Sequence, residues 1–174
     1  TSLAVAMHAV SPVVVVPPGS EDQAESHGVV AVAVDGSADS AVAAHIACRE
    51  AKVRDARVLA INTWGLEVVD GFVVTESDAD QFAAIQDRQT ALVERTLASA
   101  RRDYPDVQVD IQVIHGQVAK TLIEQSESAD LMVLGSRGRG CFAGKLLGSV
   151  SQKVLRGSRC AVVIDKAPTR RRTG

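Results

Sequence analysis

The stretch LMVLGSRG, residues 131–138, contains the pattern that decides the fold. Its first four residues form a short apolar run, typical of a strand that is buried on both faces of a sheet. Gly135 ends this run, and a glycine-rich loop is expected to extend to Leu147. A helix is predicted over residues 149–156. A buried strand, a glycine loop and a helix in this order indicate an α/β architecture.

The same alternation of apolar strands and helices runs through the rest of the chain. Residues 107–113 alternate apolar and polar side chains, which indicates a strand at a sheet edge. Ser37 is expected to cap the first long helix. The pattern therefore predicts a doubly wound parallel sheet. The expected strands are 29–34, 58–61, 107–113, 131–134 and 160–164, and the other expected helices are 38–54, 78–102 and 118–128.

Composition excludes several classes of function. The chain has 174 residues, a net charge of −2 and only 3% aromatic residues, which argues against a nucleic-acid partner. No apolar run approaches the ~18 residues of a membrane-spanning helix. Cys48, Cys141 and Cys160 form no C-x-x-C motif, so three reduced thiols in a cytoplasmic protein are expected.

The two ends of the chain resemble each other. A shift of 148 residues places Thr1 on Ser149 and the segment Val13–Val16 on Ala161–Ile164. Residues 1–20 are therefore interpreted as the last helix and strand of a preceding copy of the domain, followed by a linker over 21–27. The alternative is a chance similarity between two valine-rich segments. The segment Val13–Val16 is expected to add to the sheet edge at residues 160–164, in this chain or in a neighbouring one.

The glycine loop has the properties of a phosphate cradle. Gly135, which lacks a Cβ, would let a ligand approach the backbone, and Gly138 could adopt a positive φ and direct N–H groups toward phosphate. Gly148 would admit a phosphate close to the start of the following helix, whose first amides are free donors. These amides belong to Ser149, Val150 and Ser151. The hydroxyl groups of Ser149 and Ser151 would provide two further hydrogen-bond donors. Turn formation alone is the alternative role of these glycines.

The spacing Gly135, Gly138, Gly148 and Ser149 satisfies the pattern G-x2-G-x9-G-[S/T]. Through this motif, and through the segments VAVDGS (32–37), ADLMVL (129–134) and SVSQKV (149–154), the chain resembles the universal stress protein family over residues 28–166. The resemblance implies a Rossmann-like, five-stranded parallel sheet of the adenine nucleotide alpha hydrolase-like type, with strand order 3-2-1-4-5. It also implies ATP binding, dimers formed through the edge of the last strand, and a role in stress response or dormancy. Residues 167–174 are expected to be a disordered basic tail.

The resemblance also assigns roles to individual residues. Asp35 ends the first strand at the predicted switch point, where its carboxylate would contact ribose or hold Mg²⁺ through water; a turn or cap residue is the alternative. The backbone of Thr63 would hold the adenine edge, while Arg137 and Arg139 could either reach phosphates or remain solvated. The expected nucleotide-binding set is Ala33, Val34, Asp35, Thr63, Gly135, Ser136, Arg137, Gly138, Arg139, Gly148, Ser149, Val150 and Ser151.

Four functions remain open at this point. The favoured one is a regulator that binds ATP with Mg²⁺ and shows at most slow hydrolysis. A slow ATPase is the second, although no residue is assigned as a dedicated base. The third is an interaction domain without nucleotide, against which the intact glycine motif argues. Binding of a cyclic nucleotide is the fourth, since the same cradle could accept one phosphate.

Overall fold

The computed structural model describes residues 2–9, 11–18, 26–65, 79–138 and 147–165. The predicted loop over 65–77, except for its first residue, and the predicted tail lie outside these ranges, as do Arg139 and Cys141. Six strands form a single sheet in the order β1-β6-β5-β2-β3-β4. Their bounds are β1 Val13–Val15, β2 Val29–Ala33, β3 Arg57–Trp64, β4 Val109–His115, β5 Leu131–Gly135 and β6 Ala161–Asp165.

The predicted α/β class and parallel sheet are confirmed. The pairs β3–β4, β2–β3, β2–β5 and β5–β6 are all parallel. Strands β2 to β6 follow the expected 3-2-1-4-5 order, and β4 lies at the predicted edge. The sheet has six strands rather than five, because β1 pairs antiparallel with β6 and places Val13 opposite Ile164. This antiparallel strand lies against the sheet edge that was expected to receive it.

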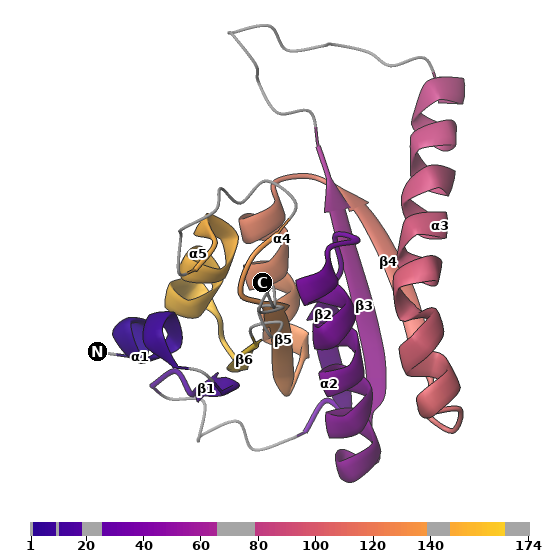
Figure 1. Cartoon of the computed structure of the whole chain (residues 1–174). Helices are drawn as coiled ribbons and strands as arrows, with labels where there is room; N and C mark the ends of the chain where they lie inside the picture. The colour runs from indigo at the N-terminus through magenta and orange to yellow at the C-terminus, as the bar shows by residue number, and fades with distance from the viewer. Residues whose placement is uncertain (1, 10, 19–25, 66–78, 139–146, 166–174) are drawn as a thin grey trace, which may run out of the picture.

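The helices cover both faces of the sheet (Figure 1). Two long helices, α2 and α3, pack over one apolar cluster that contains Val32, Ala47 and Leu97. Two shorter helices, α4 and α5, cover the other face, where Met132 and Val154 are fully buried. The bounds are α1 Ser2–His8, α2 Ala38–Arg54, α3 Ala79–Asp103, α4 Val118–Gln125 and α5 Ser149–Gly157, and a 3₁₀ turn over Ser126–Ser128 replaces the expected end of α4.

Local sequence signals explain where the central elements start. Ser37 caps α2 as predicted, since its side chain accepts a hydrogen bond from the Ser40 amide at 3.1 Å. Asp130 precedes β5 and fastens the start of β2 to it: the carboxylate accepts bonds from the His27 amide, the Val29 amide and the Ser26 hydroxyl. Burial raises the pKa of Asp130, but these three hydrogen bonds outweigh that effect and hold it below its usual value.

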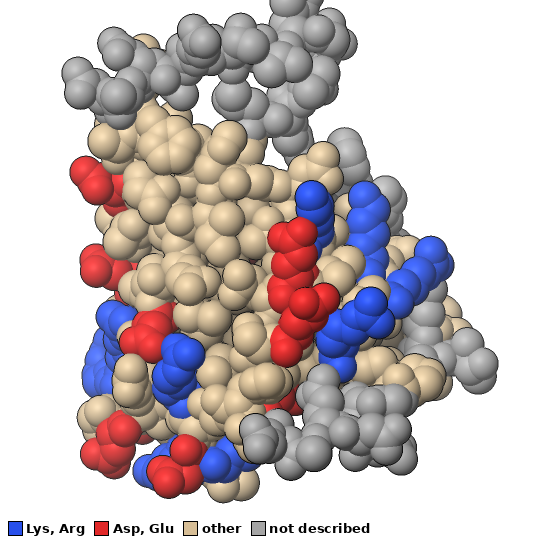
Figure 2. All heavy atoms as spheres, turned by 180° about the vertical axis from the view of Figure 1, so that it is seen from behind, with Lys and Arg blue, Asp and Glu red and all other residues tan. Residues whose placement is uncertain are grey.

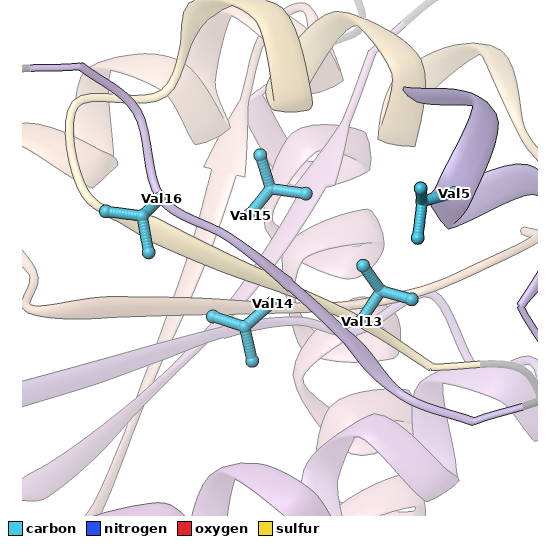
Figure 3. Close-up of a pocket in the computed structure, with 5 residues that line it drawn as sticks. All are labelled: Val5, Val13, Val14, Val15 and Val16. Carbon is cyan, nitrogen blue, oxygen red and sulfur yellow. The ribbon is translucent and has the colours of Figure 1, made fainter. Parts of the chain in front are cut away.

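The first helix and strand leave valine side chains on the surface. Val5, Val14 and Val16 are 54%, 58% and 56% exposed. Together with Val13 and Val15 they line a surface groove between α1 and β1, in which Val13 lies nearer Val5 than Val14 does (Figure 3). The outer side of β1 is an apolar sheet edge, which is a surface that soluble domains usually cover.

Charged side chains of both signs lie next to each other on the face opposite to that of Figure 1 (Figure 2). Within α4, Lys120 Nζ lies 3.8 Å from Glu124 Oε1. Charges of both signs therefore alternate on the visible face. Within the described residues, no helix is both long and apolar enough to cross a membrane.

Candidate functional site

The site lies where strand order reverses, at the carboxyl ends of the neighbouring parallel strands β2 and β5. Asp35 follows β2 by two residues and is partly buried. Its Oδ1 atom accepts a hydrogen bond from the Ser37 amide at 2.9 Å, which fixes the turn between β2 and α2. The carboxylate therefore has the turn role that was the alternative for Asp35, and it also stands beside the glycine loop.

Gly138 faces that carboxylate. A Cβ atom at this position would lie 2.8 Å from Asp35 Oδ2, closer than any relaxed contact. The predicted positive φ of Gly138 is wrong, because among the described glycines only Gly28 and Gly36 adopt one. The absence of a side chain at Gly138 therefore lets its backbone approach the Asp35 carboxylate closely.

Gly135 has a packing role that the sequence interpretation missed. A Cβ on Gly135 would lie 2.8 Å from Asp39 Cβ and 2.9 Å from the Asp39 carbonyl carbon. The first turn of α2 therefore occupies the space that was expected to admit a ligand. The missing side chain of Gly135 therefore allows close contact between β5 and α2.

Asp39 is the residue of this site that the sequence analysis did not find. It is 7% exposed, and its Oδ2 atom accepts hydrogen bonds from the Ser136 hydroxyl at 2.9 Å and the Arg137 amide at 3.1 Å. Arg137 Nε also lies 3.5 Å from Oδ2. Ser136 and Arg137, both predicted to bind nucleotide, thus bind a carboxylate of the protein. An acidic residue in the first turn of a helix beside the predicted switch point was the available signal.

The start of α5 closes the loop. Gly148 is the N-cap residue; it brings no capping side chain, and its amide donates to the Ser136 carbonyl at 2.8 Å. The Ser151 hydroxyl donates to the Gly135 carbonyl at 3.0 Å, so this proton is used inside the protein. Of the residues that the structure describes, none accepts a bond from the amides of Ser149 or Val150. These amides lie at the positive end of the helix dipole.

The remaining predicted residues lie around this centre. Val34 is buried, and Ala33 is partly buried at the end of β2. Thr63 lies near the end of β3, and its buried hydroxyl oxygen has no hydrogen-bond partner among the described residues. His115, at the end of β4, is exposed, and its ring centroid lies 4.6 Å from that of Trp64. The part of the chain that is described holds no group of three or more His, Cys, Asp or Glu side chains arranged around a metal ion.

Comparison with known proteins identifies the family. The profile of the universal stress protein family matches residues 28–166, the range expected from the sequence. The chain belongs to this family. Two universal stress proteins of Mycobacterium tuberculosis are 34% identical over 161 residues and 39% identical over 140 residues, which is 92% and 80% of this chain. The chain spans about half the length of these relatives, 51% and 46%.

Solved universal stress proteins share the fold. UspA from Lactobacillus plantarum superposes with a TM-score of 0.64 at 18% identity, covering 80% of this chain and 98% of that one. A universal stress protein crystallised in complex with cAMP superposes with a TM-score of 0.54 at 25% identity, covering 78% and 94%. The likeness to UspA supports the fold, and the second structure shows that a family member holds a phosphate-bearing nucleotide.

Proposed function

We propose that this universal stress protein binds an adenine nucleotide, ATP with Mg²⁺, and acts as a nucleotide-dependent regulator of stress response or dormancy in the cytoplasm. The observation that carries the proposal is the pair of donor amides of Ser149 and Val150 at the start of α5, next to the loop in which the Gly138 backbone approaches the Asp35 carboxylate. Donor amides at a helix N-terminus favour phosphate over neutral ligands. The family member solved with cAMP supports this class of ligand.

The residues present fit a nucleotide with Mg²⁺. Mg²⁺ is commonly bound by one or two carboxylates, with phosphate oxygens and water completing its shell. Asp35 offers one carboxylate, whose Oδ2 atom faces the Gly138 backbone. The amides of Ser149 and Val150 would take phosphate oxygens, and the Thr63 backbone would hold the base edge. The ion would neutralise phosphate charge next to Asp35.

A regulator is favoured over an ATPase. Hydrolysis requires an attacking water, a group that positions it and stabilisation of the charge on the transferred phosphoryl group. Asp35 Oδ1 is engaged by the Ser37 amide, and the Arg137 guanidinium is paired with Asp39. Both groups are thus engaged within the protein rather than placed to position water or to stabilise a transferred phosphoryl group, so we expect turnover to be slow or absent.

The proposal is tested by releasing bound small molecules and by measuring binding directly. Protein purified without added nucleotide is denatured, and the supernatant is analysed by chromatography and mass spectrometry. Titration calorimetry then measures the affinities for ATP, ADP, cAMP and adenosine. Tight binding of an adenine nucleotide supports the proposal, and a protein that binds none of the four refutes it.

A pair of variants tests the position of the site. Gly148→Ala places a Cβ 3.3 Å from the Ser136 carbonyl at the start of α5 and should weaken ATP binding about tenfold by shifting the donor amides. Gly157→Ala is the matched control, because it crowds Ile123 at the far end of the same helix. Equal loss of ATP affinity in both variants would show that the site lies elsewhere.

We further propose that residues 1–20 are the end of a preceding copy of this domain, and that β1 forms the contact between two copies. The pairing of Val13 with Ile164 supports this, since β1 and β6 are the segments that resemble each other in sequence. The same edge would join two chains if β1 were displaced. Sedimentation of the chain with and without residues 1–20 tests this proposal. A monomer that becomes a dimer on truncation supports it, and an oligomeric state that truncation does not change refutes it.

A further inference from the structure

The Asp39 carboxylate occupies the place of an anion ligand inside the protein. Its Oδ2 atom receives the Ser136 hydroxyl, the Arg137 amide and the Arg137 guanidinium at 2.9, 3.1 and 3.5 Å. A hydroxyl, a backbone amide and a guanidinium are the donors that proteins commonly use for phosphate. The loop after β5 therefore carries anion-binding groups that an internal carboxylate already engages.

The position of Arg137 allows its guanidinium to bind either the Asp39 carboxylate or a nucleotide phosphate. Its side chain is 37% exposed, whereas that of Asp39 is 9% exposed, so the guanidinium can leave the carboxylate without disturbing the core. Its Cα atom lies 3.7 Å from the position that a Cβ on Gly148 would take, directly beside the start of α5. A side chain as long as arginine reaches the space in front of the α5 amides from there.

From this geometry we infer that Asp39 is a specificity-determining residue, which holds the Arg137 guanidinium away from the nucleotide phosphates and limits the affinity that each phosphate adds. The inference rests on the nucleotide-binding function proposed above and adds to it. An arginine paired with a carboxylate contributes little net charge to a nearby phosphate, while an arginine without that partner contributes a full positive charge. Asp39 would thereby reduce the factor by which the site binds ATP more tightly than ligands with fewer phosphates.

The decisive variant is Asp39→Asn. The asparagine oxygen can still accept from the Ser136 hydroxyl and the Arg137 amide, so the loop keeps its shape, but the ion pair with the guanidinium is lost. We expect the ratio of ATP affinity to adenosine affinity to rise about three- to tenfold at low salt, because one additional unpaired charge faces the phosphates. The rise should shrink in 0.5 M salt, where exposed charges are screened.

Two further variants complete the cycle. Arg137→Gln alone should change the ATP to adenosine ratio by less than about twofold, since the guanidinium is held on Asp39 in the native protein. The double variant Asp39→Asn/Arg137→Gln should return the ratio to the native value. Calorimetry on the whole chain with ATP and adenosine, at two salt concentrations, measures all four proteins.

The outcomes separate clearly. An equal loss of ATP and adenosine affinity in Asp39→Asn would show that the carboxylate only supports the loop, and an unchanged ratio would also overturn the inference. If Asp39→Asn does not fold, Arg137→Gln still decides the matter: a tenfold fall in the ratio would show that the arginine already contacts phosphate. A native protein that binds neither ligand would overturn the proposed function and this inference together, whereas native binding with an unresponsive ratio overturns the inference alone.

Discussion

The contact between Gly135 and α2 gives a sharp prediction about stability. A Cβ on Gly135 would lie 2.8 Å from Asp39 Cβ and 2.9 Å from the Asp39 carbonyl carbon, where relaxed carbon contacts are roughly 3.5–4.0 Å. Both atoms lie within or next to the helix backbone, so α2 must shift by a large part of the difference. Overpacking of this kind costs about 1–3 kcal/mol. We therefore expect Gly135→Ala to lower the free energy of unfolding by about 2 kcal/mol.

Urea denaturation followed by circular dichroism measures this loss, and thermal unfolding should show a fall of roughly 4–8 °C in Tm. Gly116→Ala is the control, because its Cβ would meet a single side-chain atom, the Thr121 hydroxyl oxygen, at 3.2 Å. That hydroxyl can move, so the control should lose less than about 1 kcal/mol. If Gly135→Ala were as stable as the native protein but bound nucleotide poorly, the glycine would serve ligand approach and the packing argument would fail.

Three further perturbations follow from buried polar groups. Asp130→Asn should cost about 1–2 kcal/mol at neutral pH by weakening the bonds from two amides and Ser26. Because folding lowers the pKa of Asp130, this difference is present above the unfolded pKa of about 4 and disappears as pH falls through the folded pKa, which urea titrations at several pH values would show. Thr63→Val removes a buried hydroxyl without a described partner and should raise stability by about 0.5–1 kcal/mol; a loss measured by the same denaturation would contradict this. Burial raises the pKa of the Cys48 and Cys160 thiols, so iodoacetamide at pH 8 should leave both unmodified in the native protein by mass spectrometry, and rapid labelling of either would disprove it.

The parts of the fold that depend on local pattern were predictable from the sequence. The alternation in residues 107–113 indicated an edge strand, and β4 is at the edge because its polar residues need a solvated side. Ser37 indicated the start of α2 because a serine side chain can accept from the amide three residues later. Apolar runs located β2 and β5 to within a residue of their observed ends. In each case the signal comes from residues that are close together in the sequence.

The chemistry of the glycine loop was only partly predictable, because it depends on contacts between segments about 100 residues apart. The bond between Ser136 and Asp39 spans 97 residues, and no spacing rule connects the two. A glycine pattern indicates where a side chain must be absent but not what fills the space: α2 for Gly135, and a carboxylate for Gly138. The sequence therefore predicted where β5 ends and where α5 begins, on either side of the loop, while the roles of individual glycines required the fold.

The role of Asp39 shows why the intact glycine motif alone does not specify a ligand. The motif requires glycine or a hydroxyl residue at four positions, whereas Asp39 lies outside it, on α2. A related protein with a neutral residue at this position would keep the loop, the α5 amides and Gly138, but would release the arginine for phosphate. Members with the same motif would then differ in how strongly they favour ATP over a nucleotide with a single phosphate. The first turn of α2, read together with the glycine loop, is therefore the place to look for ligand preference within this fold.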